Sequence, residues 1–142
     1  MATIKAKLAL FESLDTDKIV IEALTESADA LADLNAEQIN TGLKADGSEM
    51  PDYSFRSVFQ YGKPPGPIRL RDTGAWQAGI YVKVEGDKVV FNNTDGKDQM
   101  LTDKYGENIK GLSEKYKAEG IREKVKPVFK EKIQEATKLL MK

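Results

Sequence analysis

The chain has 142 residues, the usual length of one folded domain. It contains no Cys and no His, which excludes disulfides, thiolate metal sites and a Cys nucleophile and removes the commonest general base near neutral pH. No apolar run approaches the ~20 residues that a membrane-spanning helix needs. We therefore predict one soluble domain over residues 1–142, without a membrane partner.

The N-terminal stretch lacks the apolar core and the small-residue cleavage site of a signal peptide. We expect a mobile arm over residues 1–12, with an edge strand over residues 1–8 as the alternative. The first amphipathic segment of the domain follows this stretch.

The net charge of −1 hides an uneven distribution along the chain. Residues 1–60 hold five basic and eleven acidic side chains, a net of −6, whereas residues 113–142 hold nine basic and five acidic side chains, a net of +4. Such asymmetry is typical of a basic tail that binds nucleic acid, or of complementary faces that associate with one another. Solvated helix faces explain it equally well.

The first predicted element is an amphipathic helix over residues 17–33. Thr16 or Asp17 can cap its N-terminus by accepting from free backbone N–H groups. Acidic side chains such as Glu22 and Asp29 fall on the face opposite a stripe at helical spacing. The positions of the stripe are Ile19, Val20, Ala23, Leu24, Ser27, Ala28, Leu31 and Ala32.

The segment after this helix is predicted to combine a turn and a loop. Asp46-Gly47 is a strong turn signal because Gly adopts positive φ at low cost. Residues 37–44 are expected to be extended, and residues 37–53 are predicted to form a small hairpin. Residues 54–68 contain three prolines and two glycines and are predicted to be a long Pro/Gly loop. Its aromatic side chains argue against disorder and favour a functional loop: Phe55, Phe59 and Tyr61.

A β-hairpin is the most strongly indicated element. The β-branched runs Ile80–Val84 and Val89–Phe91 flank a Gly-containing turn at Glu85–Lys88. Because side chains alternate along a strand, one face is expected to hold Ile80, Val82 and Val84, and the other Tyr81 and Lys83.

The C-terminal third is predicted to be helical. Residues 99–105 form a short helical turn, an irregular stretch follows to Leu112, and Ser113 begins the last helical region. Pro127 either kinks this helix or marks a helix that starts near Lys126. The fold class is therefore α+β, with an N-terminal helix, a small antiparallel sheet with a central β-hairpin, and a long C-terminal helix. The apolar stripe of that helix comprises Ile121, Val125, Val128, Phe129, Ile133, Ala136 and Leu140.

Catalytic and ligand-binding motifs are not found. Gly62–Gly66 resembles a phosphate loop only in composition, because its two prolines remove N–H donors that a phosphate cradle needs. The carboxylates within residues 46–52 and 95–98 lack the spacing of a calcium loop, and no motif places a Ser beside a base. We therefore predict that the chain is not an enzyme and binds no cofactor and no metal. A hydrolase with two facing carboxylates stays open as an alternative.

The basic C-terminal helix and the single Trp each allow two interpretations. The lysines of the helix alternate with Glu123, Glu131 and Glu135, which favours a solvated face over one that follows phosphates. Nucleic acid is thus not expected as a partner, and a nucleic-acid-binding accessory protein that uses this helix is the alternative function. Trp76 is expected in the core rather than as an interface anchor.

The run Ile68–Ile80 resembles the Asp-Thr-Gly signature of phage tail-completion and virion-morphogenesis proteins. The first two signature residues can satisfy local backbone donors, and the Gly permits a tight turn. This fixes how the Trp enters the core, so we interpret the signature as a structural motif and not as a catalytic one. Its residues are Asp72, Thr73, Gly74 and Trp76.

The order of the later elements extends this resemblance. In the family, the signature precedes a β-hairpin, a Tyr/Gly-containing segment and a long C-terminal helix with a proline near its start. Here Tyr105-Gly106 and Pro127 follow the hairpin in that order, and the family often has Ser where this chain has Gly79. Residues 34–133 are also similar to a group of uncharacterised phage and prophage proteins.

The resemblance implies a structural protein of a phage or prophage virion at the head–tail junction, as a tail-completion, neck or connector protein. It implies a ring homo-oligomer that contacts connector and tail-tube proteins, located in the virion and in the host cytoplasm during assembly. A toxin–antitoxin or inhibitor module is a weaker alternative, for which no motif is found. Candidate partner contacts lie in the loop 54–68 and the segment 92–112, at Phe55, Phe59, Tyr61, Lys63, Tyr105 and Ile109.

Overall fold

The structure is a computed structural model that describes residue 5, residues 15–71 and residues 74–140. The arm expected over residues 1–12 lies outside this part of the chain, apart from residue 5. The fold is α+β, as the sequence predicted.

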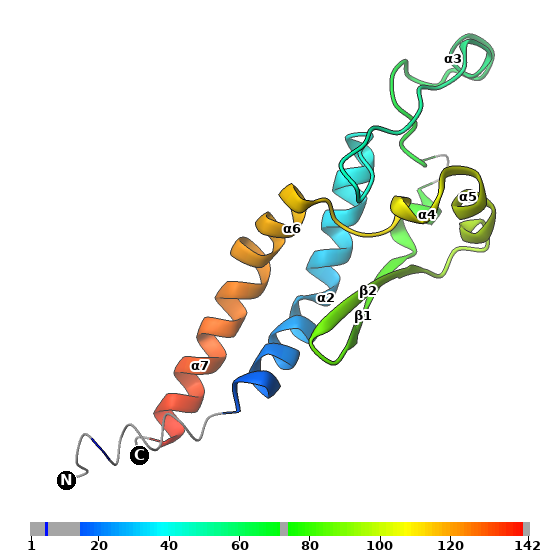
Figure 1. Ribbon diagram of the computed structural model, residues 1–142. Helices are drawn as coiled ribbons and strands as arrows, with labels where there is room; N and C mark the ends of the chain where they lie inside the picture. Colours follow the sequence, from blue (N-terminus) through cyan, green and yellow to red (C-terminus); the bar gives the residue numbers. More distant parts are fainter. Residues whose placement is uncertain (1–4, 6–14, 72–73, 141–142) are drawn as a thin grey trace.

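A long helix, a two-stranded hairpin and a C-terminal helical segment make up the architecture. Helix α2 (Thr16–Asn40) lies between the hairpin and the C-terminal helix α7 (Lys126–Leu140) (Figure 1). The hairpin consists of β1 (Ile80–Glu85) and β2 (Lys88–Asn93), and β1 contacts α2. Helices α2 and α7 run antiparallel, so the start of α2 lies beside the end of α7.

Helix α2 is longer than the sequence predicted. It includes residues 37–40, so the expectation of an extended segment over residues 37–44 is wrong there. The buried amide of Gln38 accepts from the backbone N–H of Ser113 at 2.7 Å and donates to the carbonyl oxygen of Gly111 at 3.0 Å. These tertiary hydrogen bonds hold the last turn in helical form, and such contacts override local propensity.

Local hydrogen bonds close both ends of α2. The carboxylate of Asp15 accepts from the backbone N–H of Lys18 at 3.0 Å, so Asp15, and not one of the two residues after it, is the N-cap. At the other end, the hydroxyl of Thr41 donates to the carbonyl oxygen of Gln38 at 2.6 Å. The helix therefore starts slightly earlier than predicted, and a side-chain hydrogen bond caps its C-terminus.

The predicted turn at Asp46-Gly47 is confirmed, but the hairpin around it is smaller than expected. Leu43 and Glu49 form an isolated antiparallel bridge, and Gly47 has a φ of 84°. Ser48 donates both its hydroxyl and its backbone N–H to the Asp46 carboxylate, and these bonds lower the pKa of Asp46. The predicted hairpin is thus reduced to a short turn.

The β1–β2 hairpin is confirmed, with its predicted faces. Glu85 pairs with Lys88 across a two-residue turn in which Gly86 has a φ of 63°. Exposure alternates along β1: Ile80, Val82 and Val84 are buried or half-buried, whereas Tyr81, Lys83 and Glu85 are exposed.

The C-terminal helical region begins where the sequence predicted and changes its hydrogen-bond pattern before Pro127. Ser113 caps α6 (Glu114–Gly120), the segment η2 (Ile121–Val125) is a π-helix, and α7 follows. Because Pro127 has no backbone N–H, a regular α-helix would lose a hydrogen bond here, and the wider π-turn accommodates this loss. Of the two predicted alternatives, a kink at Pro127 or a helix that starts near Lys126, the structure has a regular helix from Lys126, which continues the helical run of α6 and η2 without a break.

Two short helical pieces connect the hairpin to this region. Helix α5 (Asp98–Tyr105) confirms the helical turn predicted over residues 99–105 with one additional residue. A single 3₁₀ turn, η1 (Glu107–Ile109), follows it. Together they bring the chain back against the C-terminal half of α2, because the carbonyl of Ile109 accepts from the side chain of Asn35 at 3.4 Å.

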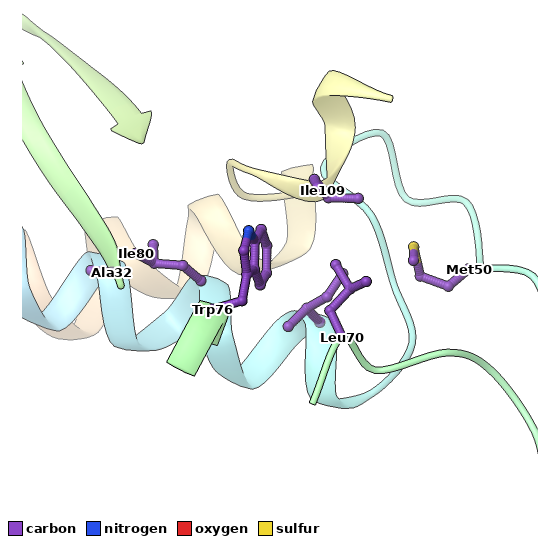
Figure 2. Packing of buried hydrophobic residues seen from close by; sticks show 7 residues of the cluster. Ala32, Met50, Leu70, Trp76, Ile80 and Ile109 are labelled. Atoms are coloured by element: carbon purple, nitrogen blue, oxygen red, sulfur yellow. The ribbon is translucent and has the colours of Figure 1, made fainter. Parts of the chain in front are cut away.

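In the described part of the chain, the hydrophobic core has two clusters along α2. One surrounds Trp76, and the other joins α2 to α6 through Leu31, Leu34, Leu112 and Tyr116. Within the described residues, every buried side-chain polar atom has a hydrogen-bond partner. Figure 2 shows the first cluster, which contains Ala32, Ile39, Met50, Leu70, Trp76, Ile80 and Ile109.

Candidate protein-contact surface

The segment predicted as a continuous loop over residues 54–68 contains a short helix, α3 (Phe55–Tyr61). The side chain of Ser54 accepts from the backbone N–H of Ser57 at 3.1 Å, and Gly62 ends the helix with a φ of 68°. All three prolines follow Gly62, so they do not interrupt the helix. The loop prediction is therefore wrong for α3, because the prolines were counted without regard to their position.

Helix α3 carries an exposed aromatic cluster, which we call the aromatic tip (Phe55, Phe59 and Tyr61). Their exposed fractions are 78%, 74% and 62%. The rings of Phe55 and Phe59 lie one helical turn apart, with centroids 4.3 Å from each other. Arg56 lies over the ring of Tyr61 at 5.9 Å from its centroid and donates to Gln60 at 2.9 Å. The tip is thus locally ordered although none of its residues is buried.

Two antiparallel chain segments hold the aromatic tip at one end of the molecule. Asp52 and Pro67 form a bridge, and the backbone N–H of Tyr53 donates to the carbonyl oxygen of Gly66 at 2.9 Å. Lys63 lies over the ring of Tyr53 at 5.9 Å from its centroid. In Figure 1, α3 projects from the end of the molecule opposite the last turns of α7. This placement leaves the tip free of the helix pair.

A groove of about 690 Å³ lies at the base of the aromatic tip. It joins residues of the tip to α4 (Ala75–Ala78) and α5. Basic and aromatic or apolar side chains line it, together with small residues. The side chains that give it this character are Tyr53, Tyr61, Lys63, Arg71, Lys97 and Met100.

Trp76 is a core residue, as predicted. It is 3% exposed, and its indole N–H donates to the carboxylate of Asp98 at 3.0 Å. Lys110 lies 2.9 Å from the other oxygen of Asp98, and both side chains of this ion pair are largely buried. Gly74 has a φ of 85° and is the N-cap of α4, so the chain turns sharply before the Trp. Asp72 and Thr73 lie outside the described residues.

The two candidate contacts in the segment 92–112 differ in position. Ile109 has an exposed fraction of 0% and belongs to the Trp76 cluster, so the prediction that it contacts a partner is wrong. Tyr105 is half-buried, and Lys104 lies 5.3 Å from its ring centroid. The Tyr-Gly segment therefore contributes mainly to packing, and the aromatic tip carries the contact prediction.

The contact between α2 and α7 is an ion-pair network. Lys132 lies 2.6 Å from Glu26 and 3.7 Å from Glu22, and its side chain is 18% exposed. The hydrogen bond to Glu26 and the nearby carboxylates raise the pKa of Lys132. The hydroxyl of Ser27 donates to the carbonyl oxygen of Lys124 at 3.1 Å. The lysines of this helix were predicted to be solvated, but the carboxylates of α2 hold Lys132, which is therefore a structural residue.

A metal site and a membrane-spanning helix are both absent from the described part of the chain. Among residues 15–71 and 74–140, no group of three or more Asp or Glu side chains could hold a metal ion. No helix of the described residues is long and apolar enough to cross a membrane.

Comparisons with known proteins give no relative. Neither a protein-family model, nor a curated protein, nor a solved structure matches the chain.

Proposed function

We propose that the chain is a structural protein of a phage virion that acts at the head–tail junction by protein–protein contacts and without catalysis. The aromatic tip is the observation that carries this proposal. Aromatic side chains are enriched at protein interfaces, and large exposed apolar groups that lie together mark interaction surfaces. The head–tail station is supported by the resemblance around residues 68–80 and by the order of the elements behind it.

The geometry of the aromatic tip suits insertion into a partner. Phe55 and Phe59 lie on one face of a capped helix with their rings in contact and tilted by 34°, so the two apolar groups are already held side by side. Burying one such Phe side chain stabilises a complex by about 1.5–3 kcal/mol. The groove at the base of the tip adds Lys63, Arg71 and Lys97 to a lining that also contains aromatic and apolar side chains. Interfaces commonly combine apolar and charged groups in this way.

The proposed partners are other copies of the chain and the virion proteins on either side of the junction. Copies form a ring, and the aromatic tips contact the connector or the tail tube. The chain is made in the host cytoplasm and is retained in the virion.

A gene-deletion experiment in the encoding phage or prophage tests this function. Deletion is expected to leave filled heads and free tails that do not join, as seen by electron microscopy. Wild-type chain supplied from a plasmid restores joined particles, and the Phe55→Ser/Phe59→Ser variant does not. Tyr81→Ser is the control, because Tyr81 is an exposed aromatic residue on the hairpin, away from α3. Normal tailed particles after deletion would overturn the proposal.

Nucleic-acid binding by the basic C-terminal helix stays the alternative. Lys124, Lys126, Lys130 and Lys138 are exposed, whereas Lys132 is held by carboxylates of α2. A DNA titration at low and high salt tests it, because phosphate contacts weaken steeply with salt. Binding at low salt that is lost at high salt would favour the alternative, and no binding at low salt would remove it.

A further inference from the structure

Two rows of exposed charge run along the long helices. On α2, the positions 17, 21, 25, 29, 33 and 37 are all exposed and are spaced four residues apart. Asp29, Asp33 and Glu37 form the C-terminal half of this row, which we call the acidic row. Along η2 and α7, the equally spaced positions 122, 126, 130, 134 and 138 are exposed as well. Arg122, Lys126 and Lys130 are the N-terminal positions of this second row, and we call them the basic row.

The two rows have matching spacing. Residues four apart lie on neighbouring turns of a helix, about 6 Å apart along its axis. The three acidic side chains and the pair Lys126 and Lys130 therefore repeat at the same interval, and Arg122 precedes that pair in the wider turn of η2. Within the described residues, neither the acidic row nor Lys126 and Lys130 forms an ion pair. Arg122 pairs only with its neighbour Glu123, at 3.4 Å and in an exposed position.

We infer that a second copy of this chain docks its basic row on the acidic row of the first, with α2 and the partner's α7 antiparallel. This inference rests on the proposed function, because it names the contact between neighbouring subunits of the ring. In the antiparallel register, Glu37 faces the partner's Arg122, Asp33 faces the partner's Lys126, and Asp29 faces the partner's Lys130. The next position in each row is neutral, at Thr25 and at Gln134, so the charged part of each row ends there.

The antiparallel register leaves more of α7 beside α2 than the parallel one. A parallel arrangement also forms three charge pairs, but it carries positions 134 and 138 beyond Asn40, where α2 ends. The antiparallel arrangement keeps residues 122–138 level with turns of α2, although each step of four residues turns about 40° around a helix, so the three charged positions of each row are the ones that face the partner. Charge complementarity along two helices commonly sets orientation and register in this way.

The orientation of the helices within one chain determines how the copies are related. Helices α2 and α7 are antiparallel inside the chain, where Lys132 pairs with Glu26 (Figure 1). If α2 is also antiparallel to the partner's α7, then all copies point the same way. Each copy uses one surface as donor and a different surface as acceptor, which is a heterologous contact. Such contacts build a closed ring when the rotation between copies closes.

The same contact should be weak for two copies and stronger for a closed ring. Exposed ion pairs contribute little each, and salt screens them. Glu131 and Glu135 also lie on the exposed side of α7 and reduce the attraction. In a closed ring each copy is held at two interfaces, so association is expected to rise steeply with concentration.

Charge reversal in purified protein tests the contact. The acid-to-base variant carries Asp29→Lys, Asp33→Lys and Glu37→Lys, and the base-to-acid variant carries Arg122→Glu, Lys126→Glu and Lys130→Glu. Wild type should self-associate in analytical ultracentrifugation, at least about tenfold more weakly at high than at low salt. Each variant alone should be monomeric, and an equal mixture of the two should associate again. The sixfold variant, with both rows reversed, should also associate by itself.

A matched control separates the rows from net charge. Asp87→Lys, Asp103→Lys and Glu107→Lys change the net charge as much as the acid-to-base variant does, at exposed positions outside both rows. This control should associate like the wild type. Far-UV circular dichroism and the melting temperature verify that every variant is folded.

Disulfide trapping tests the register, because the chain has no Cys of its own. Oxidation of the Asp33→Cys/Lys126→Cys variant should give a ladder of covalent multimers on a non-reducing gel. A mixture of the two single variants should stop at dimers. Asp33→Cys/Glu107→Cys, with its second Cys outside the rows, is the control and should give no ladder.

Several outcomes would overturn the inference. These are a wild type that stays monomeric at all concentrations, reversal variants that do not complement each other, or a base-to-acid variant that loses DNA binding but not self-association. Failure of these self-association tests does not affect the proposed role of the aromatic tip, because tip variants are scored by head–tail joining and not by self-association. Conversely, if the charge-reversal variants complement each other but gene deletion still gives normal virions, the proposed head–tail role alone is ruled out.

Discussion

The aromatic tip and the Trp76 cluster are both built on a short helix with aromatic side chains, yet one is exposed and the other is buried. Helix α3 has seven residues and none is buried, whereas α4 has four residues and its Trp is 3% exposed. The difference comes from neighbours and not from composition. Helix α4 lies against α2, β1 and η1, and Asp98 of α5 accepts from the indole N–H of its Trp, whereas α3 projects from two antiparallel chain segments.

This difference separates stability from recognition within one small chain. The Trp76 cluster holds the hairpin, η1 and the C-terminal half of α2 together, so changes there should lower the free energy of unfolding. The aromatic tip contributes little to the core, so changes there should alter binding and leave stability in place. Four variants test this division, from the largest expected effect on stability to the smallest.

Trp76→Ala should give the largest loss of stability. It removes a buried aromatic side chain from the centre of the cluster and leaves a cavity, which costs about 3–5 kcal/mol in the free energy of unfolding. Urea unfolding followed by circular dichroism measures this, because the variant has no Trp fluorescence. Met100→Ala, at a position 59% exposed, is the control and should stay within about 0.5 kcal/mol of wild type. Equal effects of the two would contradict a core centred on Trp76.

Asp98→Asn should give the second-largest loss. It keeps the shape of the side chain but removes the charge that faces Lys110, which then stays largely buried without its counter-ion. We expect a loss of about 1–3 kcal/mol in urea unfolding at neutral pH. Glu114→Gln removes one partner of the exposed pair with Lys117 and should change stability by less than about 0.5 kcal/mol. If Asp98→Asn left the free energy of unfolding unchanged, water would solvate Lys110 as well as the Asp98 carboxylate stabilises it.

The comparison also explains which parts of the structure the sequence could predict. The hairpin, the turn at Asp46-Gly47 and the cap at Ser113 depend on local chemistry, and all three were predicted correctly. The last turn of α2 depends on the buried amide of Gln38, whose partners lie more than seventy residues away along the chain. Periodicity within one segment cannot detect such a contact.

The candidate site shows the same division between local and distant information. The aromatic residues of α3 were selected from the sequence, but their helix was missed because the prolines of the segment were given too much weight. Ile109 was predicted as a partner contact within the segment 92–112, although it is a core residue. The sum of charge over a long segment does not predict the charged rows, because a row depends on which charges share one helix face.

Gly79→Ala tests the link between the hairpin and the Trp76 cluster. A Cβ atom at this position would lie 2.5 Å from the amide oxygen of Asn93. That side chain donates to the carbonyl oxygen of Trp76 at 2.6 Å and accepts from the backbone N–H of Asp95 at 2.8 Å, so it cannot move without breaking one of these bonds. We expect a loss of about 1–2 kcal/mol in the same unfolding assay. Gly96→Ala, where no atom lies within 4 Å, should be close to neutral, and similar losses for both would indicate a backbone effect.

The Phe55→Ser/Phe59→Ser variant should have the smallest effect on stability. Both side chains are more than 70% exposed, and they contact chiefly each other, so their removal should change the free energy of unfolding by less than about 0.5 kcal/mol. Urea unfolding measures the whole chain, and amide hydrogen exchange reports whether α3 itself opens more often. A loss above about 1 kcal/mol would show that the tip packs against the domain. A stable variant that no longer restores head–tail joining would assign the two Phe side chains to recognition alone, because neither ring would then be needed for the fold.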